Sequence, residues 1–455
     1  MAKLNKFSKS QGPILKQPLW ERALFKYLVI VGLVLVQYGQ TTTYDYALDD
    51  SIFITNNTRV QKGWDDIPSL FKAQWSGRSE DRTGFRPITL LSFATDVQFF
   101  GLDPHVSHTI NVLIYAIACI LLMQVLSKLF PQKEWLIFLL TLLYAVHPLH
   151  VEVVANIKSR DELLAMVFGV LFIGAHLTYF ETGKIKYLLL APMLYLLSCT
   201  SKESGITFLG VSLAIALFSA EFGWRRRLSS MVSSVSVFAL ILPAKFLLEA
   251  KNVIVDKSAE MKEMGVYSFD GFLGNPLVDI ESKAMIFGNG MAVLWQSIKV
   301  FVFPHPLVHD YSFNHFPLTI FFWTHASFWI GTALFFLLIG ISIYGLKRKT
   351  MITVGAVWFL VTVSIYLSVV VPSTDIFAER FLFVPSIGLL LIVMGCVDLI
   401  PNVSKRQINL TVLAIGLPLM VQSYSRVPAW KDTKTLVQTD IDKLPNCVRA
   451  NYNYA

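Results

Sequence analysis

Charged residues are scarce in this chain. Of its 455 residues only 15% are charged, while 54% are hydrophobic, whereas a typical soluble domain has about a quarter of its residues charged. This scarcity excludes an ordinary soluble domain and favours lipid as the solvent. The formal net charge of +8 comes from short basic clusters between apolar runs, not from one basic stripe. Nucleic acid is therefore not expected as a partner.

Cysteine is equally scarce. The four cysteines lie far apart, and Cys119, Cys199 and Cys396 sit inside apolar runs. This placement suits neither a disulfide framework nor a zinc site, and it argues against cysteine chemistry. A small-residue cleavage site is also missing between the first apolar run and the next polar stretch. That absence indicates an uncleaved membrane span and not a signal peptide.

Long apolar runs, in contrast, occur along most of the chain. A membrane-spanning helix needs about 20 mostly apolar residues, and this rule predicts about eleven spans. They lie near residues 24–42, 108–128, 134–149, 162–180, 186–200, 203–220, 229–248, 318–345, 351–371, 380–400 and 408–425. The predicted fold class is an all-α polytopic membrane protein with a large polar loop at 44–107, too long for a simple turn.

Basic residues mark one side of this arrangement. They cluster at the N-terminus and near 128–133, 184–186, 225–227, 347–349 and 405–406. By the positive-inside rule this side is the cytoplasm, so the N-terminus is predicted inside. The loop at 44–107, the loops at 150–160, 249–283 and 372–379, and the C-terminus are predicted outside. The membrane can be a bacterial inner membrane or the endoplasmic reticulum, and the sequence leaves that choice open.

Two segments depart from the simple pattern of spans. The segment 284–303 is apolar enough to span, but counting it would move 347–349 to the wrong side, so an interfacial or re-entrant helix is predicted there, with a true span as the alternative. From residue 426 to 455 the chain is polar and helix-patterned, which is typical of the start of a helical repeat. The predicted organisation is a transmembrane domain at 1–425, with outer segments at 44–107 and 249–317. The repeat region at 426–455 is expected to continue beyond the last residue.

The strongest local signal for chemistry is the pair Asp49 and Asp50 in YDYALDDSIFITNN, just beyond the outer end of the first span. A carboxylate at the membrane surface can meet both a lipid head group and a soluble acceptor. It can act as a general base or contribute to a divalent metal site that bridges a phosphate. Capping a helix or lying solvated in a loop is the ordinary alternative for such a pair.

A second dense group of charges lies in HPLHVEVVANIKSRDELLA, between the third and fourth spans. Charge beside lipid is costly unless it is paired or faces a cavity, so a functional site is the default hypothesis. The candidates for substrate binding in this stretch are His147, His150, Glu152, Arg160 and Asp161. A metal such as Mg or Mn, held by His147 and His150 with Asp50, is left open beside the alternative of helix capping.

Three further groups lie at predicted outer helix ends. They are Arg86, the pair Lys202 and Glu203, and the pair Glu379 and Arg380. Cations there would neutralise a phosphate or pyrophosphate leaving group, Arg through a two-pronged fork and Lys as a point charge. Local ion pairs that stabilise helix ends are the alternative.

Taken in order, these motifs resemble a known family, the transmembrane and tetratricopeptide-repeat-containing O-mannosyltransferases of the GT-C superfamily. This chain has a counterpart of each of six elements of that family. The elements are the DD pair, S-x-R-P-[LI]-T-x-L-S-F, H-x-x-N-V-L-[LI], H-P-x-H-x-E with R-x-[DE]-L-L-A, K-E-x-G and E-R-[FY]-L-[FY]-x-P-S-x-G. The counterparts lie at Asp49–Asp50, Gly84–Phe93, His108–Ile114, His147–Ala165, Lys202–Gly205 and Glu379–Gly388. The chain departs from the pattern in KSRDELLA, where Glu162 adds a charge, and in QWSGRSEDR, so donor or acceptor choice can differ.

The resemblance implies a GT-C glycosyltransferase fold, a polyprenyl-phosphate-linked sugar as donor, mannose as the expected sugar, and a Ser or Thr hydroxyl of a protein as acceptor. It also implies helical repeats from about Trp430. By analogy with the superfamily, Asp49 takes the proton from the acceptor hydroxyl in a single displacement that inverts the anomeric centre, and the cations hold the phosphate. The alternatives are transfer of a preassembled oligosaccharide, transfer of sugar to a lipid, and a non-catalytic membrane scaffold.

Overall fold

The structure, a computed structural model, describes residues 22–71, 85–253, 275, 277, 282–312, 321–345, 348–369 and 375–454. The regular elements in these ranges are helices and short helical turns, without a β-strand. The first helices are α1 (Ala23–Tyr38), α2 (Thr58–Gln61), α3 (Ile67–Leu70), α4 (Pro87–Phe100), α5 (Pro104–Leu129), α6 (Glu134–Val146), α7 (Val151–Ala155), α8 (Arg160–Thr182), α9 (Ile185–Ser201), α10 (Thr207–Phe218) and α11 (Trp224–Val253). The later ones are α14 (Lys283–Val302), α15 (Ala326–Gly345), α16 (Met351–Val363), α17 (Pro385–Asp398), α18 (Lys405–Arg426), α19 (Thr433–Asp440) and α20 (Val448–Tyr454). The prediction of an all-α chain is confirmed for this part.

Length and apolarity identify six helices in the described ranges that can cross a membrane, or seven if the bent pair Pro131–Val146 and Pro148–Ala155 is one span. The six are Ala23–Thr43, Pro104–Leu129, Ile157–Thr182, Lys283–Val302, Ala326–Gly345 and Lys405–Lys431. Four shorter apolar helices, of 10 to 17 residues, accompany them. The chain is therefore a multi-pass membrane protein, but the predicted count of eleven spans is not confirmed. Each of the eleven predicted segments does contain a helix.

Burial and exposure of apolar side chains fit this environment. Large aromatic side chains such as Tyr115, Phe172 and Trp358 are fully buried in one continuous core between the helices. Long apolar side chains on the outside of the bundle, such as Leu189 and Phe336, are more than half exposed. Large exposed apolar faces indicate a membrane or partner surface, and here they lie on candidate spans and apolar helices.

The predicted basic clusters meet at one end of the bundle, which we call the basic end. Lys26 in the first turn of α1 pairs with Glu134 at the start of α6, at 2.6 Å. Lys133 pairs with Asp398 at the end of α17, also at 2.6 Å. Lys349 pairs with Glu221 after α10, and Lys128 with Glu181 at the end of α8. The predicted grouping of these basic residues is thus confirmed, whereas which side of the membrane they face stays a prediction.

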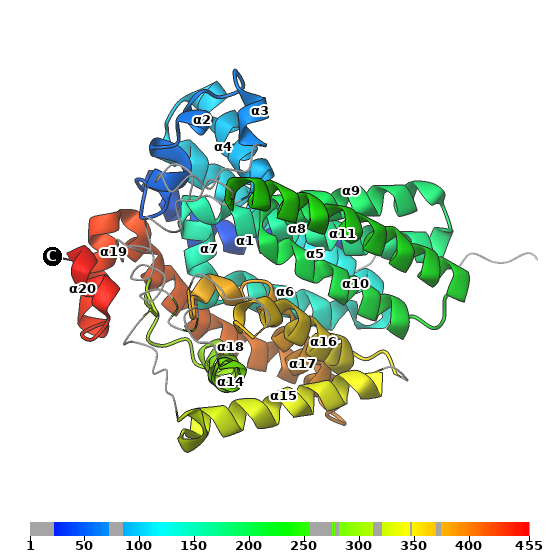
Figure 1. Ribbon diagram of the computed structural model, residues 1–455. Coiled ribbons are helices and arrows are strands. Elements are labelled where there is room, and N and C mark those ends of the chain that lie inside the picture. Colours follow the sequence, from blue (N-terminus) through cyan, green and yellow to red (C-terminus); the bar gives the residue numbers. More distant parts are fainter. Residues whose placement is uncertain are drawn as a thin grey trace, which may run out of the picture.

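The other ends of α1, α6 and α8 meet at the opposite end, which we call the loop end. Asp49 and Asp50 follow α1 there, His147 follows α6, and Arg160 begins α8. From the helical rise per residue, the length of α8 places the two ends about 35 Å apart. Figure 1 shows α2, α3 and α4 of the first loop, and the C-terminal α19 and α20, gathered toward the left of the bundle, away from the right-hand ends of α9, α10 and α11.

Helix α14 runs across the loop end. A Cβ on Gly290 would lie only 2.8 Å from the carbonyl oxygen of Leu367, which follows α16 at this end. Near the other end of α14, the Phe301 ring stacks on His147, with centroids 5.0 Å apart. In Figure 1 α14 is viewed almost along its axis, while α15 and α18 run across the picture. By length and apolarity α14 could span the membrane, while both of its halves contact the loop end, so the interfacial helix stays a prediction.

Candidate active site

The Asp49–Asp50 turn is built by its own backbone. After α1 the chain makes a 3₁₀ turn at Gly39–Thr43, and Leu48 then takes a left-handed backbone with φ of 47°. A left-handed Leu is strained and persists only where its surroundings hold it. The Asp50 carboxylate supplies this support, because it accepts the N–H of Ala47 at 2.8 Å and the N–H of Lys158 at 2.7 Å. Asp50 thereby ties the turn to the start of α8.

Asp50 is fully buried by this arrangement. Burial raises its pKa from an ordinary 3.8 to about 7, although the two N–H groups that it accepts act in the opposite direction. Both oxygens of this carboxylate accept hydrogen bonds from backbone N–H groups, so the carboxylate has a structural role. Of the two predicted catalytic carboxylates, Asp50 is thus placed to position the turn.

Asp49 lies differently. Its side chain is half-buried, and within the described ranges its carboxylate has neither a hydrogen bond nor an ion pair. Its electrostatic neighbour is Arg380. Burial alone would lower the pKa of Arg380, but the carboxylates of Glu152, Asp375 and Asp49 hold it well above its ordinary value. Asp49 therefore presents a carboxylate to solvent beside a fixed guanidinium group.

Three cations gather around the buried Asp161 at the start of α8. Arg86, which precedes α4, pairs with it at 2.6 Å, Lys202 after α9 at 3.2 Å, and Lys158 at 3.4 Å. Arg86 also pairs with Glu203 at 2.9 Å. The structure thus brings four predicted site residues together, from three separate stretches of the chain.

Arg380 brings a fourth cation to this group. It pairs with Glu152 of α7, whose second carboxylate oxygen accepts the Arg380 backbone N–H at 2.9 Å. Its guanidinium also pairs with Asp375 at 2.6 Å. Lys158 interacts electrostatically with Arg86, Lys202 and Arg380, so the four cations lie near one another. We call Arg86, Lys158, Lys202 and Arg380 the cation cluster.

The four members of the cation cluster are all paired, but they differ in exposure. Lys158 and Lys202 are buried, with 8% and 7% of their side chains exposed, while Arg86 and Arg380 keep 18% and 17% exposed. The two arginines are therefore the cations that an approaching anion meets. Carboxylates already neutralise all four, so a bound phosphate must share or replace a carboxylate partner.

Sequence reasoning missed three contributors to this site. The Phe53 ring lies beneath two cations, 5.2 Å from Lys158 Nζ and 5.7 Å from the Arg86 guanidinium carbon. Lys158 lies in the charged stretch HPLHVEVVANIKSRDELLA between the predicted ligands Glu152 and Arg160, and that position was a usable signal. Asp375 lies in the predicted outer loop, and its pairing with Arg380 has no signal in the sequence.

Arg160 and Glu379, both predicted as substrate ligands, have structural partners instead. Fully buried Arg160 pairs with Asp96 at 2.7 Å and donates to Asn111 at 2.7 Å, which joins α4, α5 and α8. Glu379 accepts the N–H of Val308 at 2.8 Å. Burial raises the pKa of Glu379 from 4.5 to about 8. Neither side chain belongs to the cation cluster.

The two predicted histidines fix the bend between α6 and α7. His147 Nε2 faces the carbonyl oxygen of Phe301 at 3.1 Å, and its Nδ1 accepts the N–H of Leu149. His150 Nδ1 lies 2.7 Å from the carbonyl oxygen of Tyr144, and its Nε2 lies 3.1 Å from the Ser386 hydroxyl. The geometry joins these rings to backbone and hydroxyl groups.

The predicted metal set of Asp50, His147 and His150 does not fit a metal ion. Both oxygens of Asp50 hold N–H groups, and the ring nitrogens of the two histidines have protein partners. Within the described ranges, no three His, Cys, Asp or Glu side chains converge as metal ligands. No step is therefore assigned to a metal on these residues.

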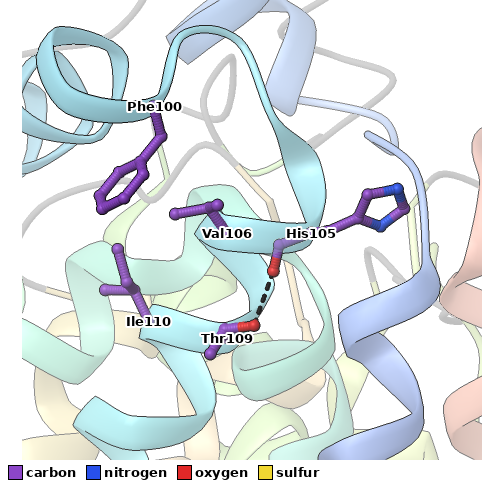
Figure 2. A pocket seen from close by; sticks show the side chains of 5 residues that line it. All are labelled: Phe100, His105, Val106, Thr109 and Ile110. Carbon is purple, nitrogen blue, oxygen red and sulfur yellow. Dashed lines mark hydrogen bonds between the residues drawn. The ribbon is translucent and has the colours of Figure 1, made fainter.

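Two cavities lie outside the cation cluster. Figure 2 shows one of about 320 Å³ between the end of α4 and the start of α5, with Phe100, Val106 and Ile110 close together while the His105 ring points away. The whole length of α4 separates this cavity from Arg86. The other, of about 330 Å³, is lined by residues of α18, α19 and the segment after α14, including His305, Gln422 and Lys443.

Known proteins with similar sequences are named protein O-mannosyl-transferases. The chain is 25% identical to a protein O-mannosyl-transferase of Caenorhabditis elegans over 94% of its length and 59% of that protein. It is 24% identical to the human protein O-mannosyl-transferase TMTC1, over 94% of this chain and 52% of that one. It is 23% identical to human TMTC4, over 96% and 63%.

The chain thus spans between about half and two thirds of the length of these relatives. No family model matches it. The similarity nevertheless covers 94% of the chain for the first two of these relatives and 96% for the third. Over most of its length the chain is thus similar to proteins named protein O-mannosyl-transferases, in agreement with the resemblance of its ordered motifs.

Proposed function

We propose that this chain is an inverting GT-C glycosyltransferase that moves a mannosyl group from a polyprenyl phosphate to Ser or Thr hydroxyls of proteins at the outer or lumenal membrane face. The observation that supports this most directly is the half-buried Asp49 carboxylate, unpaired within the described ranges, beside Arg380 of the four-cation cluster. A base and a phosphate site are the two parts that such a transfer needs. The names of the relatives supply the sugar and the acceptor class.

The proposed chemistry is one displacement. The acceptor oxygen forms a bond to the anomeric carbon of the sugar while the bond from that carbon to the phosphate oxygen breaks. The hydroxyl proton goes to Asp49, and the bonding electrons leave with the polyprenyl phosphate. The attacking and leaving oxygens lie on opposite faces of the carbon, so its configuration inverts.

The cation cluster has the larger electrostatic task. The leaving phosphate gains negative charge in the transition state, and preorganised cations stabilise that charge without moving. Arg380 and Arg86 are exposed enough to contact the phosphate, while buried Lys158 and Lys202 act from beneath. Glu152 and Asp161 hold the cations in place before the donor arrives.

The membrane arrangement agrees with this proposal. The site lies at the loop end, about 35 Å from the basic end along α8. With the basic end in the cytoplasm, as the positive-inside rule predicts, the site faces the outer or lumenal side, where a lipid-linked donor and a translocated protein acceptor meet.

The test is a transfer assay with purified protein in detergent or liposomes. An acceptor peptide rich in Ser and Thr is incubated with mannosyl polyprenyl phosphate or, separately, with a nucleotide-linked mannose. We expect one hexose per modified residue from the lipid donor alone, seen by mass spectrometry. Transfer only from the nucleotide donor, transfer of an oligosaccharide, or transfer to lipid would each overturn the proposal.

A further inference from the structure

A row of alternating charges connects the C-terminal helix α20 to the candidate active site. Arg449 in α20 pairs with Asp310 at 2.6 Å and with Asp375 at 3.0 Å. Asp375 in turn pairs with Arg380, and Arg380 with Glu152. Within this row, Arg380 carries the guanidinium group that interacts with Asp49.

The same C-terminal segment also accepts hydrogen bonds from the backbone of the Asp49–Asp50 turn. The backbone N–H of Asp45 donates to the carbonyl oxygen of Lys431 at 3.0 Å. The backbone N–H of Leu48, the strained residue just before Asp49, donates to the Thr433 hydroxyl at 2.9 Å. Residues 431–449 thus contact both the turn that carries the base and the chain of partners of Arg380.

The C-terminal segment is firmly held in this place. Asp440 at the end of α19 accepts both guanidinium N–H groups of Arg426, at 2.6 and 2.7 Å, and the backbone N–H of His309 at 2.8 Å. These bonds join α19 to the end of α18 and to the segment next to Asp310. Arg449 is therefore presented to Asp310 and Asp375 by a fixed framework.

Asp375 is shared between the two arginines, one for each carboxylate oxygen. Its Oδ1 accepts from Arg449 and its Oδ2 from Arg380. If the charge of Arg449 is removed, Arg380 loses a competitor for this carboxylate and pairs with it more strongly. Arg380 then binds a donor phosphate less well, because the phosphate competes with a stronger anionic partner.

We propose that Arg449 is a positioning residue of the active site: it holds Asp375 so that Arg380 stays available to the donor phosphate. The first C-terminal helices are then part of the transferase site, as well as the start of a repeat. The inference rests on the proposed function, since it gives Arg380 the phosphate of the lipid-linked donor.

The test compares full-length variants by steady-state transfer kinetics and by direct binding of polyprenyl phosphate without sugar. For Arg449→Met we expect the KM for the donor to rise about tenfold, equivalent to about 1.4 kcal/mol, with kcat within about twofold. The double variant Arg449→Met/Asp375→Asn should return the KM to within about threefold of wild type, because the carboxylate that competes with the phosphate for Arg380 is gone. Val448→Ala on the same helix is the control and should change neither constant.

A donor KM for Arg449→Met equal to wild type would overturn the inference, and so would a raised KM that the change at Asp375 leaves unrelieved. If Arg449→Met fails to fold, Arg449→Lys replaces it. Lys keeps the charge but loses the fork that reaches two carboxylates, and we expect a KM about threefold above wild type. A wild-type KM there would also overturn the inference.

The two proposals fail in different ways. If the wild type transfers no sugar yet binds polyprenyl phosphate, and Arg449→Met weakens that binding, the proposed function is wrong and the positioning role stands. If the wild type transfers sugar and Arg449→Met leaves both transfer and phosphate binding unchanged, the function stands and the positioning role is wrong.

Discussion

At the scale of single residues, two adjacent carboxylates have opposite tasks. Asp50 is buried and its oxygens are used by backbone N–H groups, whereas Asp49 is half-exposed and without a partner in the described ranges. The sequence predicted the pair but could not divide its roles, because the division depends on the Lys158 N–H, which is 108 residues away. The position of the pair just after the first span made it recognisable in the sequence. The difference in burial between the two side chains indicates that Asp49 is the one that can accept a proton from a substrate.

The structural role of Asp50 leads to the first expected outcome. Asp50→Asn replaces one acceptor oxygen with an NH₂ group, which leaves the N–H of either Ala47 or Lys158 without an acceptor. A buried donor left unpaired costs about 1–3 kcal/mol, so we expect a lower melting temperature. Asp65→Asn, at an exposed position in the same loop, is the control and should melt like wild type. Equal melting of all three proteins would contradict the structural role.

Glu379 gives a prediction with a defined pH dependence. Burial raises its pKa from 4.5 to about 8. The folded state then holds a proton that the unfolded state has lost, so this group's contribution to stability is fully present below pH 4.5 and is lost as the pH rises toward 8. Glu379→Gln mimics the protonated form and removes this titration. We expect the melting temperature of the variant, relative to wild type, to increase between pH 4.5 and 8. A difference that is constant over this range would show that Glu379 does not titrate there.

At the scale of elements, the apolar runs predicted the helices but not their angles. Each of the eleven predicted spans contains a helix. A long apolar run predicts a helix from the local sequence alone, without knowledge of tertiary contacts. Charge sidedness singled out segment 284–303 as an exception, and the structure places α14 across the loop end. The tie from Arg160 to α4 and α5 could not be foreseen, since Asp96 and Asn111 carry no special signal.

The crossing of α14 and α15 gives the next prediction. The two helices approach so closely that a Cβ on Gly331 would lie 1.9 Å from the carbonyl oxygen of Met291, a contact that backbone must move to relieve. We expect Gly331→Ala to destabilise the protein by about 1–3 kcal/mol, the usual effect of overpacking. Gly340 lies on the same helix with open space around it. Gly340→Ala should therefore be neutral or stabilising, by up to about 1 kcal/mol. Equal effects of the two changes on thermal unfolding would argue against the crossing.

At the scale of the whole molecule, the basic clusters predicted correctly which helix ends lie together. The ion pairs of Lys26, Lys133 and Lys349 join those ends. The site could be predicted only as a set of charged positions, because its long-range pairings join residues 41 to 228 positions apart, from Lys202 with Asp161 to Glu152 with Arg380. The contribution of the C-terminal segment had no signal at all in the residues before Trp430.

Membrane orientation can be tested on the intact protein with a membrane-impermeant maleimide. In a Cys199→Ser/Cys396→Ser background, we expect Asp65→Cys and Val302→Cys to react from the outer or lumenal side. Arg406→Cys, at the basic end, should react only after the membrane is permeabilised. Labelling of Val302→Cys from the side of Arg406→Cys would contradict the placement of α14 at the loop end.

The most direct measurement for the account as a whole is the transfer rate of Asp49→Asn with mannosyl polyprenyl phosphate and an acceptor peptide, beside Asp65→Asn as control. A lost general base costs about 10²–10⁴-fold in rate, so we expect kcat to fall by that factor while the melting temperature and donor binding stay near wild type. Full activity in a folded Asp49→Asn protein would contradict the account.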